Sequence, residues 1–310
     1  MQFGVCLPHY GKTVSLDDLR ITAQRAEALG FHSVWVSDHV ITPSHLLPRI
    51  GPIFHDAFVV LTYAAAFTQR VKLGSSVIVI PYRNPLVVAK MVSTLDVLSG
   101  GRLILGVGAG GAPDEFQALG VPSGQRGRRT DEYLRLMIAL WRQDPTSFDG
   151  RYFSFSDVRF QPKPQQKPHP PIWVGGAGDA ALRRAVALGE AWHPTSMALP
   201  TLLEKMAQLR LLAQEAGRAS GPMVTVHQGI RLATEGRGPS TALARRLGQG
   251  TPEQLREDIH TYQEMGIPTI VCNFAATTVP QMWRAMETFA SQVMAYFPEP
   301  TSGATPGGSH

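Results

Sequence analysis

The stretch from Val71 to Gly111 reads VKLGSSVIVIPYRNPLVVAKMVSTLDVLSGGRLILGVGAGG and decides the fold class of this chain. It opens with an apolar run rich in β-branched residues, continues with apolar residues at helical spacing, and closes with a second apolar run, LILGVG. Two wholly apolar strands joined by a helix are typical of a βαβ unit in a parallel sheet. Small residues occur in both strands where a ligand could approach the backbone, at Gly74, Ser75, Ser76, Gly106, Gly108 and Gly110.

The same alternation continues along the whole chain, because each of eight apolar runs is followed by a segment with helical periodicity. Eight βα units in about 250 residues plus insertions are the size of a (β/α)8 barrel. An open doubly wound sheet is the alternative, but it usually carries a glycine-rich fingerprint after its first strand, and His9-Tyr10-Gly11-Lys12 is not one. We therefore predict an α/β fold, a TIM barrel with insertions after strands 2 and 4 and around the fourth helix.

We expect one barrel domain over residues 1–297 and a disordered tail over residues 298–310, since the tail is rich in Pro, Gly, Ser and Thr. Cys6 and Cys272 fall in the first and last predicted strands, which are neighbours if the barrel closes. Their spacing is not that of metal ligands, so we expect reduced thiols, no metal and a cytoplasmic protein. The first residues, MQFGVCLPHYG, lack the features of a signal peptide.

Composition restricts the partners of this chain. Apolar residues make up 44% and charged residues 17%, which fits a well-buried globular protein rather than a disordered one. The net charge of +5 is not gathered into a basic arm, so nucleic acid is not expected as a partner. No apolar run approaches the ~20 residues that a membrane span needs. A small molecule is the expected ligand.

Candidate catalytic groups lie where predicted strands end, since barrels carry their sites at the carboxyl ends of the strands. Asp38-His39 places an acid beside an imidazole that can exchange protons near neutral pH. The alternative is that Asp38 caps backbone amides and His39 is a packing residue. Glu115, just beyond the fourth strand, is either a proton donor over the barrel mouth or a solvated loop acid.

Two further clusters suit an anion. The loop Gly175-Gly176-Ala177-Gly178 lies between a strand and a helix that starts near Asp179, so several backbone amides can point at a phosphate. A plain turn between a strand and a helix would also use glycines. Arg126, Arg128 and Arg129 form the densest basic cluster, but salt bridges to Asp131 and Glu132 are the commoner fate of such residues.

Four segments resemble the luciferase-like monooxygenase superfamily, specifically its F420-dependent oxidoreductase branch: SVWVSDH (33–39), LGSSVIVIPYRNPLVVAKMVSTLDVLSGGRLILGVGAGGAPDEF (73–116), GRRTDEY (127–133) and QPKPQQKPHPPIWVGGAGDAALRRA (161–185). The resemblance implies a barrel with a flavin or deazaflavin across its mouth. It also implies a non-proline cis peptide at Ser76-Val77 behind the ring and a cofactor phosphate on Gly175-Gly176-Ala177. The cofactor-binding set is then Ser75, Ser76, Val77, Gly108, Ala109, Gly175, Gly176 and Ala177.

The same resemblance implies catalytic roles for Asp38, His39 and Glu115, with His39 or Glu115 handling the proton. The function expected is hydride transfer between F420 and a small organic substrate, because a deazaflavin has carbon where flavin has N5 and is poorly suited to activating oxygen. The alternative within the superfamily is an FMN-dependent monooxygenase supplied by a partner reductase. A non-catalytic ligand-binding barrel and a flavin-free isomerase or aldolase are alternatives outside it.

The pocket above the ring is expected to be mostly apolar, which favours a neutral or weakly polar substrate over a sugar phosphate. Its predicted lining is Leu46, Leu47, Ile50, Ile53, Phe54, Phe116, Trp192 and His193. A homodimer is typical of the family that the chain resembles.

Overall fold

In the computed structural model of the chain, which describes residues 1–233 and 246–298, a closed barrel of parallel strands forms the centre. The predicted tail falls outside the described residues apart from Pro298. Around the barrel, each strand pairs with the next, and β7 pairs with both β5 and β10, which closes the ring. The strands are β1 (Gln2–Cys6), β3 (Ser33–Val36), β5 (Lys72–Ser75), β7 (Leu103–Gly108), β10 (Ile172–Val174), β11 (Ala191–Trp192), β12 (Met223–Leu232) and β14 (Thr269–Phe274). The predicted (β/α)8 barrel is confirmed.

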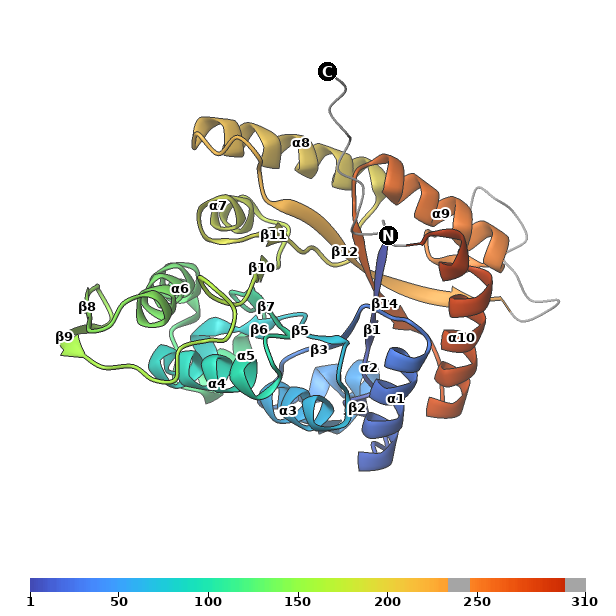
Figure 1. Cartoon of the computed structure of the whole chain (residues 1–310), viewed down its shortest axis with the longest axis horizontal. Coiled ribbons are helices and arrows are strands. Elements are labelled where there is room, and N and C mark those ends of the chain that lie inside the picture. The colour runs from blue at the N-terminus through green and yellow to red at the C-terminus, as the bar shows by residue number, and fades with distance from the viewer. Residues whose placement is uncertain (234–245, 299–310) are drawn as a thin grey trace, which may run out of the picture.

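One long helix follows each barrel strand and packs on the outside of the ring (Figure 1). These helices are α1 (Leu16–Ala28), α3 (Ala57–Phe67), α4 (Pro85–Leu98), α6 (Arg126–Arg142), α7 (Asp179–Leu188), α8 (Leu199–Glu215), α9 (Pro252–Glu264) and α10 (Val279–Gln292). Local sequence sets their starts: Ser15 with Asp18, and Thr251 with Gln254, form capping boxes. None of the described helices is long and apolar enough to cross a membrane.

Shorter elements make up the insertions between the barrel units. After β3, η1 (Ser44–Leu46), α2 (Leu47–Ile50) and β4 (Ile53–Phe54) cross the barrel mouth, and β4 pairs with β2 (Tyr10–Gly11). After β7 come α5 (Pro113–Ala118) and η3 (Ser123–Gln125). The insertion predicted around the fourth helix is a hairpin of β8 (Thr146–Asp149) with β9 (Ser154–Val158), which projects beyond α6 in Figure 1. The remaining pieces are β6 (Ile78–Val79), η2 (Ile80–Tyr82), β13 (Gln249–Gly250) and η5 (Met294–Tyr296).

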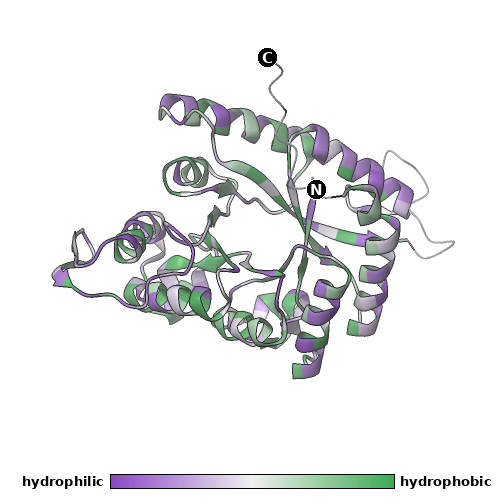
Figure 2. Cartoon of the chain, in the orientation of Figure 1, coloured by the Kyte–Doolittle hydropathy of each residue, from purple (hydrophilic) through white to green (hydrophobic). Residues whose placement is uncertain are grey.

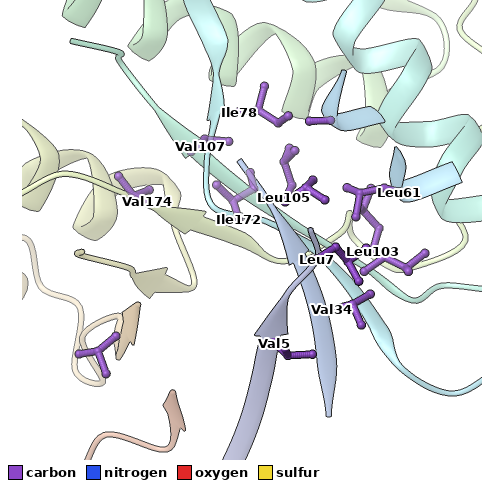
Figure 3. Packing of buried hydrophobic residues seen from close by; sticks show 14 of the residues in the cluster. Val5, Leu7, Val34, Leu61, Ile78, Leu103, Leu105, Val107, Ile172 and Val174 are labelled. Atoms are coloured by element: carbon purple, nitrogen blue, oxygen red, sulfur yellow. The ribbon is translucent and has the colours of Figure 1, made fainter. Parts of the chain in front are cut away.

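The main apolar core lies between the strands and the surrounding helices. Figure 2 shows hydrophilic residues on the outer faces of the helices and hydrophobic ones toward the sheet. Alternate residues of each strand supply this layer; Figure 3 shows Val5, Val34, Leu105 and Val174 among them. Burial of these side chains stabilises the barrel by roughly 25 cal/mol for each Å² of apolar surface removed from water.

A second, smaller apolar cluster fills the barrel interior. It shows why residue 74, predicted to face a ligand, is a glycine. Trp35 and Trp173 lie there with ring centroids 4.9 Å apart. A Cβ at Gly74 would lie 2.3 Å from the Trp35 ring, and a Cβ at Gly4 would lie 2.3 Å from its Nε1. Gly74 therefore makes room for a tryptophan and not for a ligand, which corrects the expectation from the sequence.

The third strand is broken where the sequence alone predicts one apolar run. β5 ends at Ser75, the Ser76–Val77 peptide bond is cis, and β6 resumes at Ile78. The break moves Val77 into the barrel mouth, where a Cβ on Gly108 would lie 2.6 Å from its Cγ2 and a Cβ on Gly175 would lie 2.9 Å from its Cγ1. Gly106 makes room for the Ser75 carbonyl oxygen, which a Cβ would approach to 1.7 Å. These three glycines therefore leave room for the bulge at Ser75 to Val77.

Candidate active site

The carboxyl ends of the barrel strands open into a cavity of about 770 Å³. Because every parallel strand ends on this side, loops from distant parts of the chain meet here. The lining includes Ser76, Val77 and His227 from the barrel, His39 after β3, and the insertion that crosses the mouth, while Gly111, Ala112, Pro113, Thr195 and Ser196 complete it.

His39 lies on the cavity wall and is held by a carboxylate behind it. Its Nδ1 is 2.7 Å from Glu115 Oε2, and Glu115 has no exposed side-chain surface. Glu115 also accepts hydrogen bonds from the amides of Val40 and Ile41 at 2.9 and 3.3 Å and from Tyr82 at 3.1 Å. Since an ionised carboxylate only accepts, the His39 proton resides on Nδ1, and Nε2 is the ring nitrogen left for the cavity.

Of the two candidates for handling the proton, only His39 lines the cavity. Glu115 is on α5, as a buried acceptor with four donors around it, and it does not line the cavity. Burial, and then the charge of Glu115, raise the pKa of the Tyr82 hydroxyl, so Tyr82 remains a donor to this carboxylate. The alternative of a solvated loop acid is wrong, because the Glu115 carboxylate is buried and bonds to His39.

Asp38 binds a backbone amide and an arginine. Its Oδ2 accepts from the Val79 amide at 3.0 Å, and the Arg83 guanidinium contacts both carboxylate oxygens at 2.7 and 2.8 Å. Arg83 also bonds to Asp56 at 2.9 Å, at the start of α3. Asp38 thus ties Val79, just after the cis bond, to the segment after β3 that carries His39. Asp38 also lines the cavity.

A chain of buried polar groups supports the other side of the cis bond. The Ser76 hydroxyl lies 3.0 Å from His193 Nε2 and 3.0 Å from His227 Nδ1. His193 Nδ1 is 2.7 Å from the Thr225 hydroxyl, and its ring stacks on Trp35 with centroids 5.3 Å apart. The interior tryptophan therefore positions the histidine that positions Ser76.

The buried histidines are uncharged at neutral pH. Burial, and then the neighbouring His227, lower the pKa of His193 to about 3. Burial lowers the pKa of His227 to about 4. Burial also lowers the pKa of His9 to about 4, and its Nε2 accepts the Ser37 amide at 2.9 Å. Three neutral imidazoles below and beside the cavity thus act as hydrogen-bonding groups rather than charges.

The glycine loop lies on the same rim, between two parts of the cavity wall. β10, which it follows, pairs with β7 on one side and β11 on the other, and the residues after β7 and β11 line the cavity. Gly176 to Asp179 are exposed, no side chain caps α7, and a Cβ on Gly178 would meet open space. Trp192 Nε1 fixes the loop by donating to the Gly176 carbonyl at 2.7 Å. Ala109 lies on the neighbouring rim, half-buried after β7.

The predicted pocket residues are only partly brought together. Leu46, Ile50 and Phe54 line the cavity, whereas Leu47 lines an adjacent one. Trp192 is wholly buried in the core, and Phe116 packs on Tyr82 with ring centroids 4.9 Å apart. His193 lies one layer below Ser76, and Ile53 pairs with Gly11 in the ladder above the mouth. Tertiary packing turns these side chains away from the cavity lining.

Several functional candidates were missed in the sequence. Tyr82 and Arg83 lie at the end of η2, the short turn after β6, so the rule of strand carboxyl ends could have found them. His227 is an inward-facing residue of β12, and Arg49 is carried by α2 within a segment that reads as apolar.

Of the basic cluster, Arg129 bonds to Tyr133, while Asp131 pairs with Arg184 instead of a neighbour. Glu132 accepts from the amides of residues 151–153.

Known proteins resemble this chain over most of its length. The sequence profile of the luciferase-like monooxygenase family matches residues 1–234. An uncharacterised protein of Mycobacterium tuberculosis is 32% identical over 64% of this chain and 72% of its own length. An FMNH2-dependent dimethylsulfone monooxygenase of Pseudomonas putida is 30% identical over 66% of this chain and 55% of that enzyme. An F420-dependent glucose-6-phosphate dehydrogenase of Amycolatopsis mediterranei is 34% identical over 58% of this chain and 53% of that enzyme.

Solved structures share the fold at lower identity. The monooxygenase RslO1 from Streptomyces bottropensis superposes with a TM-score of 0.80 at 22% identity, over 96% of this chain and 100% of that one. An F420-dependent secondary alcohol dehydrogenase, solved with an F420–acetone adduct, gives a TM-score of 0.79 at 22% identity over 95% and 98% of the two chains. At such identities the likeness concerns the fold.

Proposed function

Because the chain belongs to the luciferase-like monooxygenase family, we propose that it is an F420-dependent oxidoreductase. It transfers a hydride between the deazaflavin and a C=C, C=N or C=O/alcohol group of a small, mostly apolar substrate. The observation that carries this proposal is the 2.7 Å bond between His39 Nδ1 and the buried Glu115 carboxylate. A hydride reaction at a polar double bond needs one positioned group that gives or takes a proton, and this pair supplies it.

The residues present fit a ring cofactor with a phosphate. The cavity of about 770 Å³ has the Ser76–Val77 bulge in its wall, where a flat ring can lie. The uncapped start of α7 and the open space at Gly178 suit a phosphate, since unpaired amides and the helix dipole favour an anion. Ser76, Val77, Gly176 and Ala177 would hold the group, with Ser75, Gly108 and Gly175 shaping the bulge behind it.

When bound, F420 supplies the carbon that gives or accepts hydride. The remaining chemistry belongs to side chains of this chain. With its own proton on Nδ1, His39 takes a proton from the substrate at Nε2 when the substrate is oxidised and returns it from Nε2 in the reverse direction. Glu115 keeps the imidazole in one tautomer and orientation. Asp38 is proposed to position the backbone of the site and not to exchange protons, because both its oxygens bond to Arg83 or to the Val79 amide. The loop across the mouth excludes water from the reacting atoms.

An FMN-dependent monooxygenase that receives reduced flavin from a partner reductase is the second candidate. The likeness to the dimethylsulfone monooxygenase favours it. The same bulge and glycine loop serve either cofactor, so the two candidates differ in which ring the cavity accepts and not in the fold.

Titration of the purified protein with F420 and, separately, FMN tests the proposal. Micromolar F420 binding, followed by fluorescence or calorimetry, is expected together with F420 reduction or oxidation in a screen of alcohols, enones and imines. A yellow protein with releasable FMN and no affinity for F420 would instead support the monooxygenase. Absence of binding for both rings would favour a barrel with another function.

Two further properties complete the proposal. We propose a homodimer, and the exposed apolar side chains of Val59, Phe67, Leu86 and Val87 on α3 and α4 support an interface there. We also propose a cytoplasmic location, in keeping with the free thiols of Cys6 and Cys272, which lie on the paired strands β1 and β14.

A further inference from the structure

A second cavity of about 600 Å³ adjoins the first one at the barrel mouth. Its walls come from the turn after β1, from α2, and from the segment between β14 and α10. The two cavities share four lining residues, Tyr10, Arg49, Ile50 and Asn273. A molecule with its reactive part at His39 can therefore extend past Arg49 into the second cavity.

Arg49 is held at this boundary by close backbone packing. It belongs to α2, which Gly51 ends with φ +77° and an amide bond to the Leu47 carbonyl at 2.9 Å. A Cβ on Gly51 would lie 2.4 Å from the Gly11 carbonyl, so the two glycines are in contact. The β2–β4 ladder continues this contact, with Gly11 opposite Ile53. The backbone of Arg49 is thus fixed by the fold of the mouth, and its exposed side chain lines both cavities.

The charges facing the two cavities are unbalanced. In the first cavity Asp38 is paired with Arg83, His39 with Glu115, and His45 with Asp114. Among the described residues, the second cavity is lined by the cations Lys12 and Arg49 and by no acidic side chain. Among the ion pairs of the described residues, none includes Lys12 or Arg49. Two cations thus face a shared space without a counter-ion from the described chain.

The segment before α10 adds to the positive potential on the opposite wall. Thr277, Thr278 and Val279 line the second cavity at the N-terminus of this helix, and its first turn has no acidic residue. The partial positive charge of a helix N-terminus therefore has the same sign as Lys12 and Arg49. Apolar side chains, Leu47, Ile50 and Met282, line the rest of the space.

We propose that the second cavity binds the anionic end of the substrate, a carboxylate or comparable anion, with Arg49 as its main contact and Lys12 as a second one. The substrate is then an organic acid with an apolar body rather than a neutral compound. This inference rests on the proposed function for the role of the first cavity. An anionic group of the cofactor could bind Arg49 and Lys12 by the same chemistry. The test must therefore distinguish an anion of the substrate from an anion of the cofactor.

The experiment measures binding of two probes, octanoate and octan-1-ol, to the cofactor-free protein by calorimetry. The variants are Arg49→Gln, Arg49→Lys and Lys12→Gln, with Arg135→Gln on the exposed face of α6 as a matched loss of charge elsewhere. Octanoate affinity is expected to fall about tenfold in Arg49→Gln, since a charge-assisted contact is lost. It is expected to recover in part in Arg49→Lys, to fall less in Lys12→Gln, and to stay unchanged in Arg135→Gln, while octan-1-ol binds all variants alike.

Equal octanoate affinity in wild type and Arg49→Gln would overturn the inference, and so would a parallel loss of octan-1-ol binding. Titration of F420 into the same variants identifies the source of the anion. A loss of F420 affinity in Arg49→Gln without a loss for octanoate would assign the anion to the cofactor and overturn the substrate assignment. Octanoate binding is measured without cofactor. The result therefore still tests the anion site if the protein proves not to use F420.

Discussion

His39 Nδ1 lies 2.7 Å from Glu115 Oε2, across 76 positions of sequence, and only the imidazole reaches the cavity. The carboxylate is completely buried and takes its other hydrogen bonds from Val40, Ile41 and Tyr82. The pair therefore divides one task between two residues: His39 contacts the ligand, and Glu115 determines which ring nitrogen carries the proton.

Glu115→Gln is expected to release this control. The amide can donate to His39, so the imidazole loses its fixed tautomer, and kcat should fall about 100-fold, the lower end of the range of general acid–base catalysis. The affinity for the cofactor should change less than about twofold. Nitrogen-15 NMR of the histidines and the pH profile of kcat/KM check this. Tyr82→Phe keeps the His39 bond and serves as the control; equal losses in both variants would contradict the assigned role.

Gly106→Ala should destabilise the barrel. A Cβ there would lie 1.7 Å from the Ser75 carbonyl oxygen, a backbone atom that cannot move aside alone. We expect a loss of about 3 kcal/mol or more in the free energy of unfolding, the upper range for overpacking. Gly111→Ala is the matched control, since its Cβ would meet open space, and it should change stability by less than ~0.5 kcal/mol. Urea denaturation of the two variants decides the point.

Stability should fall as pH drops from about 6.5 toward 4. The pKa values of His193, His227 and His9 are lowered to about 3, 4 and 4, whereas the unfolded chain has histidine pKa values near ~6.5. The unfolded state thus binds more protons in this window, and the stabilisation, complete above ~6.5, is lost as the pH falls through it. Each histidine contributes up to about 1.4 kcal/mol per pH unit.

A pair of variants isolates this contribution. His227→Gln should reduce the slope of unfolding free energy against pH by about one proton. Thr225→Val removes a partner of His193 but no titrating group, so it should lower stability at every pH and keep the slope. A wild-type slope that persists unchanged in His227→Gln would show that this histidine does not contribute.

Gly178→Leu should weaken cofactor binding without unfolding the protein. Its φ of −79° suits any residue, and a Cβ would meet no atom within 4 Å, so stability should change by less than ~0.5 kcal/mol. A leucine there would occupy the space before the uncapped amides of α7, and the affinity for F420 should fall at least about tenfold. Calorimetric titration and a thermal melt measure both quantities. Unchanged affinity would place the phosphate elsewhere.

The sequence by itself determined the barrel, because hydrophobic periodicity and caps are local signals. The run LILGVG became β7 with both predicted ends, and Ser15 and Thr251 start α1 and α9 as their capping boxes require. The resemblance to a family further located the cis bond at Ser76–Val77 and the glycine loop before α7. These features depend on neighbouring residues, so a linear pattern contains them.

Only the tertiary structure decided how those features work together. Closure of the barrel places Glu115 behind His39 and Arg83 on Asp38. It also places two histidines from later in the chain, one just after β11 and one in β12, on Ser76. It also shows that Gly74 and Gly106 serve Trp35 and Ser75 rather than a ligand, and that Arg49 separates two cavities. Each of these relationships joins segments far apart in the chain, and it exists only because a parallel barrel brings the carboxyl ends of all its strands to one rim.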